Sequence, residues 1–494
     1  MNSSRSTRPS IADSRDLIDG RRERPSEEFE GWIRDPNTGE ELQRVRASSP
    51  LQVERAINAA TFAASSTAWT EFPATERINL LGEIANVLDE HIEPFAVADA
   101  ETSGVPISVT RIFAGGFGDI VRGAAEHLLR TPQRIELPGA VGPVLLYRLA
   151  WGPAAVIAPF NAPGFVAVKK TAYALAAGCP VILKPSEWGS KSADLLAELM
   201  SSVLEDAGLP TGVFQLLHGG SAVGSALAAD PRIRALSFTG SQTVGQSIAK
   251  SAANDMKALE LELGSNNPVI VRADADIEAT AETLAAASCK LNGQWCESPR
   301  TVFVPQKLLT SLSDAVLDNW RAIRIGHSLD VSTEFGPQGH FAQRARVENA
   351  LRKLEAEGAE VTRSSQLPDL KGLFVAPAIV RGASLSNTVE EIFGPVLVMH
   401  PVSSDTEALE EANSLKAGLA GYVFSADTEA AMLLGARMAC GEVKVNTASL
   451  LDLTQNSTQS FWGPSGIGGH GNAELLSFFL GQRIVGSDDP HAVL

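Results

Sequence analysis

The sequence lacks several features by which whole classes of protein are recognised. Only four of its 494 residues are cysteines, and no two of them stand at the C-x-x-C spacing of a metal site: Cys179, Cys289, Cys296 and Cys440. Four widely spaced cysteines are too few for the disulfide framework of a small secreted protein. The sequence therefore predicts free thiols in a reducing compartment and no metal site.

Positive charge and long apolar runs are also scarce. There are 41 lysines and arginines against 58 aspartates and glutamates, which gives a formal net charge of −17 and no basic run. Such a chain suits neither nucleic acid nor an anionic membrane. No apolar run reaches the length of about 18 residues that spans a bilayer. We therefore expect a cytoplasmic protein with a small-molecule partner, no nucleic acid and no membrane.

The start of the chain carries no recognisable targeting signal. Residues 1–28 lack the apolar core of a signal peptide, and their acidic residues argue against an organelle transit peptide. We expect residues 1–34 to form a flexible leader.

The rest of the composition is that of a folded chain. Hydrophobic residues make up 44%, and 42 glycines and 27 prolines are near average usage, so collagen-like and disordered classes are excluded. The length allows roughly three domains of about 150 residues. Apolar residues at helical spacing predict helices between residues 50 and 130, and 137–151 resembles a strand pair.

From residue 153 onward the pattern alternates between strand and helix. Strands are predicted at 154–158, 180–184, 213–217 and 235–238, with helices at 165–177, 192–207 and 222–229 between them. Such a run of βαβ units predicts a parallel sheet with a nucleotide-sized crevice at its strand ends. A second alternating stretch after residue 262 predicts another α/β layer.

Two glycine-rich segments are candidate phosphate-binding turns. Residues 466–471 (GIGGHG) match G-x-G-x-x-G, but they follow a polar loop and only 23 residues remain after them, so we interpret them as a turn. Residues 238–245 (FTGSQTVG) lie between a predicted strand and a helix, where free backbone N–H groups favour an anion. An ordinary turn capped by Ser241 is the alternative.

Cys296 is the cysteine whose surroundings suggest chemistry. It lies in a glycine-broken segment, 292–298 (NGQWCES), between a predicted helix and strand, where a rigid scaffold can present a nucleophile. Cys289 lies in an alanine-rich helix and is expected in the core. A lone cysteine is usually inert, so the position of Cys296 alone does not show that it is catalytic.

Six segments in order give Cys296 a context: 158–163 (APFNAP), 183–187 (LKPSE), 238–241 (FTGS), 262–264 (ELG), 293–296 (GQWC) and 391–396 (EIFGPV). Together they resemble the signature set of the NAD(P)-dependent aldehyde dehydrogenase superfamily, over about residues 35–485. The resemblance implies an α/β fold with a Rossmann-type cofactor domain (35–136 and 151–263) and an α/β catalytic domain (264–460). It also implies a small β flap for oligomerisation with the C-terminal segment (137–150 and 461–494), in a homodimer or homotetramer.

The resemblance implies roles for three catalytic residues. Cys296 would attack the aldehyde, and Asn161 would hold the resulting alkoxide with the Cys296 backbone N–H. Glu262 would activate the water that cleaves the thioester, with a pKa that its apolar neighbours are expected to raise toward neutrality. Glu260 is expected to face solvent. Glu262 favours hydrolysis over transfer to coenzyme A; a coenzyme A-acylating enzyme and a catalytically decayed binding protein are the alternatives.

Cofactor residues follow from the same resemblance: Ile157, Phe160, Lys184, Glu187, Gly220, Gly240, Ser241, Glu391 and Phe393. A carboxylate at Glu187 would accept hydrogen bonds from ribose hydroxyls and repel a 2′-phosphate. The sequence therefore favours NAD over NADP.

The substrate side departs from the family pattern. Residues 460–466 (SFWGPSG) lack the customary lysine, and a downstream glutamate is replaced, with Asn472 at about its position. Lys169 is a candidate for holding a carboxylate or polar tail, the alternative being a solvent-facing lysine. Phe165 and Trp295 suggest an apolar portion near the aldehyde. We therefore expect an aromatic or hydrophobic aldehyde with an anionic or polar group.

Overall fold

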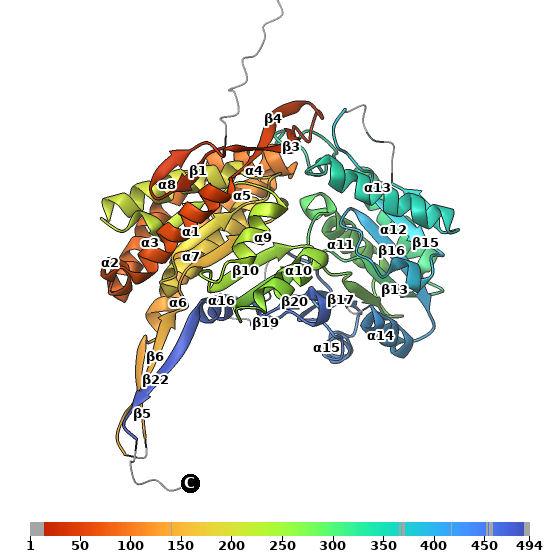
Figure 1. Cartoon of the computed structure of the whole chain (residues 1–494). Coiled ribbons are helices and arrows are strands. Elements are labelled where there is room, and N and C mark those ends of the chain that lie inside the picture. The colour runs from red at the N-terminus through yellow and green to blue at the C-terminus, as the bar shows by residue number, and fades with distance from the viewer. Residues whose placement is uncertain are drawn as a thin grey trace, which may run out of the picture.

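The computed structural model describes residues 14–139, 141–364, 367, 371–415, 417–450, 453 and 458–488. Two α/β bodies lie side by side, and a narrow arm projects from the first of them (Figure 1). In the described part of the chain, no helix combines the length and the apolar character needed to cross a membrane.

The first body is built on an eight-stranded sheet. Its strands, in spatial order, are β2 (Arg21–Glu23), β1 (Asp16–Ile18), β9 (Phe214–Leu216), β8 (Val181–Lys184), β7 (Ala154–Ile157), β10 (Ala235–Gly240), β11 (Ala258–Leu263) and β20 (Gly466–Ile467). The five strands from β9 to β11 are parallel. The chain runs outward from β7 in one direction and then from β10 in the other, so a ligand crevice is expected where β7 meets β10. The Rossmann-type sheet predicted from the sequence is confirmed.

The helices of this body cover both faces of the sheet. Those that connect its strands are α7 (Pro163–Ala177), α8 (Lys191–Asp206), α9 (Ser221–Ala229) and α10 (Gln242–Ala252), as the alternating pattern predicted. The preceding helices are α1 (Pro50–Ser65), α2 (Thr67–Thr70), α3 (Ala74–Asp89), α4 (Ile92–Ser103), α5 (Ile107–Gly115) and α6 (Phe117–Arg130). Nearly every residue of α7 is buried, because this helix lies between the sheet and the preceding helices. Side chains of α7 can therefore reach the interior of the site.

The second body contains a seven-stranded sheet. Its strands, in order, are β14 (Glu360–Arg363), β15 (Ala378–Arg381), β16 (Val396–Val402), β13 (Thr301–Pro305), β12 (Pro268–Val271), β17 (Ala420–Phe424) and β18 (Glu442–Val445). Its helices are α11 (Ile277–Cys289), α12 (Leu309–Ala322), α13 (Phe341–Ala356), α14 (Asp405–Ser414) and α15 (Thr428–Gly435). The second α/β layer expected after residue 262 is confirmed.

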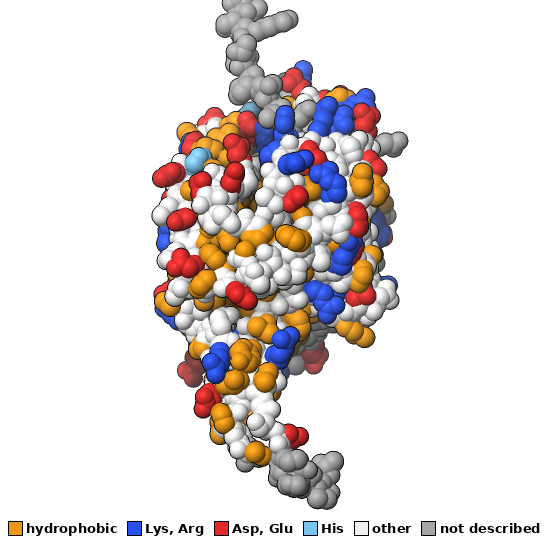
Figure 2. Space-filling model, turned by 60° about the vertical axis from the view of Figure 1, so that its left-hand side comes forward, with side chains coloured by type: hydrophobic (Ala, Val, Ile, Leu, Met, Phe, Trp, Pro, Cys, Tyr) orange, Lys and Arg blue, Asp and Glu red, His pale blue; other side chains and the backbone are white. Residues whose placement is uncertain are grey.

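The arm is a three-stranded antiparallel sheet. It joins β5 (Arg134–Leu137), β6 (Val144–Ala150) and β22 (Leu480–Gly486). A strand pair is therefore present about where residues 137–151 predicted one, and the C-terminal segment adds the third strand. Apolar side chains are exposed along it (Figure 2), among them Leu149, Trp151 and Ile484, the last of which is 67% exposed. A small isolated sheet with an apolar surface suits contact with another chain.

The expected leader differs from the structure. Residues 1–13 lie outside the described residues, but β1 pairs with β9 in the first sheet, and β3 (Glu27–Arg34) forms a hairpin with β4 (Glu41–Ala47). Leu17 and Ile18 are buried, so burial of two apolar side chains holds this segment against the sheet. The prediction of a flexible leader up to residue 34 is therefore wrong for residues 14–34.

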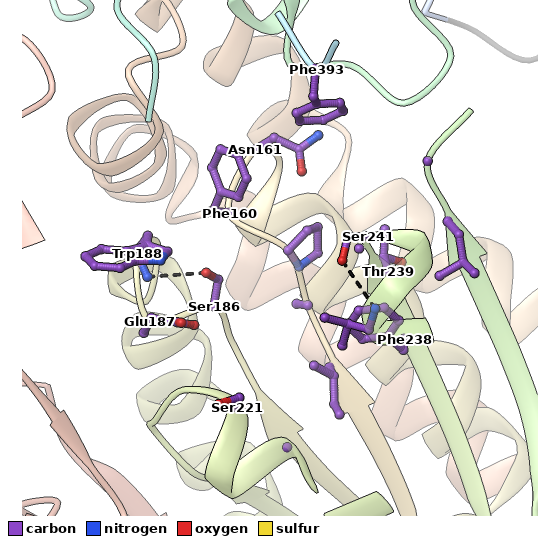
Figure 3. A pocket seen from close by; sticks show the side chains of 18 of the residues that line it. Phe160, Asn161, Ser186, Glu187, Trp188, Ser221, Phe238, Thr239, Ser241 and Phe393 are labelled. Carbon is purple, nitrogen blue, oxygen red and sulfur yellow. Dashed lines mark hydrogen bonds between the residues drawn. The ribbon is translucent and has the colours of Figure 1, made fainter. Parts of the chain in front are cut away.

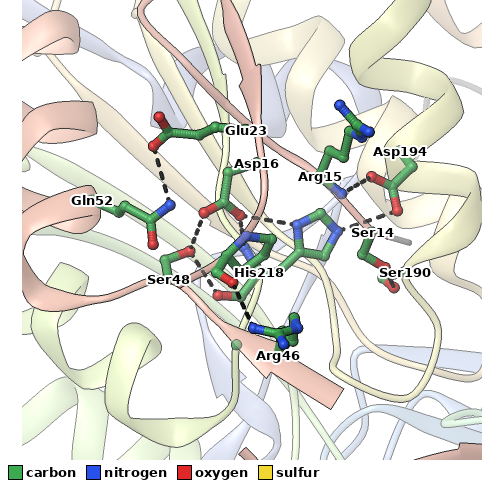
Figure 4. A network of polar contacts seen from close by, with 12 residues as sticks. Ser14, Arg15, Asp16, Glu23, Arg46, Ser48, Gln52, Ser190, Asp194 and His218 are labelled. Carbon is green, nitrogen blue, oxygen red and sulfur yellow. Dashed lines mark hydrogen bonds and ion pairs between the residues drawn. The ribbon is translucent and has the colours of Figure 1, made fainter. Parts of the chain in front are cut away.

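A buried polar network also anchors this segment (Figure 4). The imidazole of His218 lies 3.1 Å from the Asp16 carboxylate through Nδ1 and 3.3 Å from the Asp194 carboxylate through Nε2. Asp16 also accepts from the His218 backbone N–H and from the Ser48 hydroxyl. Burial acts to lower the pKa of His218, but the two carboxylates raise it to about 9. The network thus ties β1 to the loop after β9.

Candidate active site

A cavity of about 780 Å³ opens at the carboxyl ends of the parallel strands in the first body and reaches α13 of the second (Figure 3). Every catalytic and cofactor residue predicted from the sequence lines it: Ile157, Phe160, Asn161, Lys184, Glu187, Gly220, Gly240, Ser241, Glu262, Cys296, Glu391 and Phe393. The site therefore lies at the crevice that the strand order predicts.

Polar groups at the ends of β8 and β10 form one half of the cavity. The buried Lys184 ammonium donates to the carbonyls of Pro185 and Gly219, at 2.7 and 2.6 Å. Burial lowers its pKa despite the neighbouring Glu187 carboxylate. Ser241 caps α10 by accepting from the Val244 N–H at 3.4 Å, a contact that is compatible with both interpretations of this segment. The free N–H groups of that first turn lie at the cavity wall and suit an anion.

Trp188 and His340 line the cavity but were not singled out from the sequence. The Trp188 ring stacks on the His340 imidazole, with centroids 5.0 Å apart, and the predicted residue Phe160 meets the same imidazole edge-on at 4.7 Å. Burial lowers the pKa of His340 to about 3, so the imidazole is neutral near pH 7. These residues come from three distant parts of the chain, and no local motif connects them.

A sharply bent turn presents the nucleophile. After α11 the chain passes through Leu291, Asn292 and Gly293 with φ values of 47°, 59° and 77°. Only glycine fits the last position, because a Cβ there would lie 2.2 Å from the backbone nitrogen of Pro395. The Asn292 amide donates to the carbonyls of Gly104 and Pro337 at 2.8 Å each. Packing and hydrogen bonds therefore fix the position of Cys296.

The two cysteines of this region differ as expected. Cys289 is buried at the end of α11, and burial raises the pKa of its thiol to about 12. Cys296 lines the cavity. Burial, together with Glu262, Glu297 and Glu391, raises its pKa well above the ordinary value. The Cys296 thiol is therefore protonated at neutral pH and needs a base before it can attack.

Asn161 lies beside the same loop. Its side-chain amide donates to the Gln294 carbonyl at 2.8 Å, and Figure 3 shows it next to the Phe393 ring. This contact holds the amide close to the backbone of the nucleophile, where an oxyanion would form.

Glu262 connects the nucleophile to a cluster of cations. Its Oε1 lies 3.8 Å from the Cys296 sulfur and 3.2 Å from Nε2 of His470. Its Oε2 lies 3.5 Å from the Lys170 ammonium. Burial acts to raise the pKa of Glu262, but the charges of His470, Lys170 and Lys169 hold it well below its usual range. The expectation of a pKa near neutrality is therefore wrong, because these cations are not neighbours in sequence.

Glu260 also departs from its prediction. It is 1% exposed rather than solvated. Its carboxylate pairs with the Lys170 ammonium and accepts from the Ser237 hydroxyl at 2.5 Å. Residues two apart on a strand point to the same face, so Glu260 follows Glu262 into the interior covered by α7.

The three proposed substrate residues do not line the cavity. Lys169 is 9% exposed, its ammonium lies 5.9 Å from the Phe165 ring centroid, and its charge acts on Glu262. A solvent-facing Lys169 is thus excluded. Phe165 packs on Phe113 at 5.3 Å. Trp295 is 5% exposed in the core of the second body, with Lys290 over its ring.

The unusual C-terminal segment contributes a residue that sequence reasoning missed. Gly466 and Ile467 form β20, which pairs with β11 opposite Glu262; Gly469 and His470 form β21 (Gly469–His470), which pairs with β19 (Gln459–Ser460). The α16 helix (Asn472–Phe478) follows. Residues 466–471 thus form two short strands, each antiparallel to its partner, and do not form the strand-turn-helix motif that binds a dinucleotide. This agrees with their interpretation as a turn. The residue of this segment that contacts Glu262 is His470, two positions before Asn472.

Comparison with known proteins identifies the class to which this site belongs. The model of the aldehyde dehydrogenase family matches residues 24–485, so the chain belongs to the aldehyde dehydrogenase family. It is an oxidoreductase that acts on the aldehyde group. The resemblance drawn from six motifs is confirmed, and the match includes residues 24–34, which had been assigned to the leader.

Individual relatives cover most of the chain. The 4-(hydroxymethyl)benzenesulfonate dehydrogenase TsaD1 of Comamonas testosteroni is 32% identical over 420 residues, 84% of this chain and 86% of the relative. The solved structure of betaine aldehyde dehydrogenase from Staphylococcus aureus in complex with NAD+ superposes with a TM-score of 0.89 at 27% identity, covering 96% of this chain and 94% of that one. Aldehyde dehydrogenase C of Pseudomonas syringae, a cysteine-to-alanine mutant with NAD+ and octanal, gives 0.89 at 29% identity, covering 97% and 98%.

Proposed function

We propose that the enzyme uses NAD to oxidise an aromatic or hydrophobic aldehyde with an anionic group to its carboxylic acid. The observation that carries the chemistry is the 3.8 Å contact between Cys296 and Glu262 in one cavity. A nucleophile and a carboxylate base so placed can serve both the formation and the hydrolysis of a thioester.

The site fits a dinucleotide cofactor. The cavity is long enough to reach from Lys184 and Glu187 at the end of β8 to Glu391 and Phe393 beside Cys296, and the α10 N-terminus offers N–H groups between these ends. NAD bound there supplies the hydride acceptor. The Glu187 carboxylate would bind ribose hydroxyls and repel a 2′-phosphate, which favours NAD over NADP. The two solved structures described above both hold NAD+.

The residues of the chain divide the reaction into steps. Glu262 accepts the Cys296 thiol proton, and the sulfur attacks the carbonyl carbon to give a thiohemiacetal. Asn161 and the Cys296 backbone N–H stabilise its oxyanion as it forms. Collapse of the oxyanion to a carbonyl expels the hydride, which bound NAD would accept, and leaves a thioester on Cys296. Glu262 releases the thiol proton to solvent and then draws a proton from water as the water attacks the thioester, and the sulfur leaves as thiolate. A carboxylate in this position supports hydrolysis and argues against the coenzyme A-acylating and decayed alternatives.

A cation close to Glu262, although outside the cavity lining, supports the anionic group. Lys169 and Phe165 form a cation beside an aromatic ring on α7, and Phe113 packs on that ring. A carboxylate or sulfonate would interact with the ammonium, while an aromatic body would pack on the rings. The relative from Comamonas testosteroni is named for a benzene ring with a sulfonate.

Reduction of NAD with a panel of aldehydes tests this proposal. The panel pairs benzaldehydes with and without a 4-carboxylate or 4-sulfonate, and adds a linear semialdehyde acid. We expect the charged aromatic aldehydes to give the highest kcat/KM, and Lys169→Leu to lower that value about tenfold for them alone. Lys353→Leu on the outer face of α13 is the matched control. An equal effect of Lys169→Leu on charged and neutral aldehydes would remove Lys169 from substrate recognition, and absence of NADH with every aldehyde would refute the reaction.

We further propose a homodimer or homotetramer that works in the cytoplasm, with the arm as its contact surface. The exposed Ile484 and Val485 on β22 support the arm as the contact surface. The free thiols of the four cysteines support a reducing compartment such as the cytoplasm. The proposed domains are those expected from the sequence, with residues 14–34 now added to the cofactor domain. Gel filtration of a variant with Ile484→Asp should yield monomers if the arm holds the oligomer together.

A further inference from the structure

His470 stands behind Glu262 as seen from the nucleophile. Its Nε2 lies 3.2 Å from the carboxylate oxygen that also lies nearest the Cys296 sulfur. The imidazole is held from two other sides: its ring meets Phe461 edge-on at 5.3 Å, and its backbone pairs with Gln459. His470 does not line the cavity, so it acts on the reaction only through Glu262.

The charges around His470 come from three elements. Glu262 on β11 faces its Nε2, Lys169 on α7 repels its positive form, and Glu297 in the loop after the nucleophile attracts it. Burial lowers the pKa of His470, but Glu262 and Glu297 more than offset this and the net direction is upward. The neighbours of Glu262, in contrast, lower its pKa. In the resting pair, the shared proton therefore lies on the imidazole.

This charge distribution creates a problem for Glu262 acting alone. A carboxylate with a lowered pKa is a weak base and takes a proton from water poorly. Two groups that interact strongly titrate as a pair with two apparent pKa values. The higher of the two belongs to the step in which the imidazole of His470 loses its proton. Once the imidazole has lost its proton, the pair is a much stronger base than the carboxylate alone.

We propose that Glu262 and His470 together form the general base for thioester hydrolysis, with His470 as the final proton acceptor. The water oxygen forms a bond to the thioester carbon while its O–H bond breaks and the proton moves to Glu262. Glu262 passes a proton to Nε2 of His470, which starts the step unprotonated. The carbon–sulfur bond then breaks, and its electron pair leaves with Cys296. The proposal rests on the aldehyde oxidation described above.

Decay of the acyl-enzyme as a function of pH tests the proposal. The enzyme is mixed with NAD and an aldehyde that it oxidises, and rapid quenching follows the thioester between pH 5.5 and 9.5. In the wild type we expect the decay rate to rise with pH through an inflection above 6.5, as the imidazole loses its proton. In His470→Gln the amide can still donate to Glu262 but cannot take up a proton. We expect its decay to be about 10- to 100-fold slower at pH 8 and without that inflection.

Two further variants keep the result interpretable. His470→Ala removes the donor as well and should behave like His470→Gln, while His127→Gln, at a half-buried histidine on α6, should keep the wild-type profile. A full NADH burst in the His470 variants shows that the site is folded and acylates. If His470→Gln keeps the wild-type rate and inflection, the pair is not the base. If only His470→Ala is slow, His470 merely positions Glu262 and the proton transfer is refuted. A wild type that forms no NADH would instead refute the aldehyde oxidation itself.

Discussion

Raising the pH from 7 to 9 should favour detachment of β1 from its neighbour β9 in the first sheet. The segment is anchored there by His218, whose imidazole lies between the buried Asp16 carboxylate and that of Asp194 (Figure 4). The fold raises the pKa of His218 to about 9 from an ordinary 6.5. A histidine with a raised pKa stabilises the fold fully below its unfolded pKa, and this stabilisation is lost as the pH rises through the folded pKa.

The size of the effect follows from these two values. Below pH 6.5 the ion pairs of His218 contribute about 3 kcal/mol, because each tenfold change in proton affinity corresponds to about 1.4 kcal/mol. About 2.5 kcal/mol remains at pH 7 and about 0.4 kcal/mol at pH 9. The pKa of Asp194 is lowered despite its burial, with His218 as the main opposing charge, so its own contribution is lost only on acidification. Complete loss of the shift would correspond to about 40-fold, but Asp194 stays beside His218 when β1 detaches, so only the part of the shift due to Asp16 is lost. We therefore expect the equilibrium for detaching β1 to rise about tenfold between pH 7 and pH 9.

Limited trypsin digestion measures this detachment. Arg21 and Arg22 lie on β2, which pairs with β1, and cleavage there requires the segment to open. When opening is fast compared with cleavage, the cleavage rate follows the open population. We expect about tenfold faster cleavage at pH 9 than at pH 7, after correction with a peptide substrate. His218→Gln should be cleaved fast at both pH values, and an equal pH response of the variant and the wild type would refute the argument.

Three substitutions test the roles within the cavity. Cys296→Ala should lower the rate of aldehyde oxidation by more than about 10³-fold, while its affinity for NAD measured by calorimetry stays within about twofold of the wild type. Cys289→Ala, the control, should keep the activity. A tenth of the wild-type turnover in Cys296→Ala would contradict the assignment of the nucleophile. Glu262→Gln should form its one equivalent of NADH more slowly, because the Cys296 thiol loses its base, and should then turn over about 10²-fold or more slowly, because thioester hydrolysis loses the same base. Undiminished steady turnover would reopen transfer to coenzyme A. Glu187→Ser should narrow the preference for NAD by relieving repulsion of a 2′-phosphate; a wild type that prefers NADP would show that Glu187 does not set the choice.

The part of the molecule that the sequence predicts is the part that local patterns determine. The alternation of strands and helices from residue 153 follows from apolar runs and helical spacing, which are properties of neighbouring residues. Most of the cofactor residues stand in short motifs at the ends of those strands, whereas Cys296, Glu391 and Phe393 stand in motifs of loops in the second body; all of them line one cavity. The order in which the motifs occur was the decisive signal, because no single motif sufficed.

The parts that could not be predicted depend on contacts between distant segments. Residues 14–34 contain few apolar residues, and their place in the sheet rests on Leu17 and on the pairing of Asp16 with His218. The burial of Glu260 depends on Lys170, which lies 90 residues earlier in the sequence. No periodicity reports such pairs, and composition alone assigns charged residues to the surface.

The charges around Glu262 connect its chemistry to the choice of substrate. Lys169, Lys170 and His470 all lower the pKa of one carboxylate or interact with it, and Glu260 pairs with Lys170. Burial of so many cations costs free energy unless anions accompany them. Glu297, whose pKa is raised mainly by burial, is the other carboxyl that acts on His470. An anionic substrate beside Lys169 would add negative charge near Glu262 and His470 at the moment of binding, and it would favour the protonated form of His470. We therefore expect charged aldehydes to shift the pH inflection of thioester decay upward relative to neutral ones, an effect that His470→Gln should abolish.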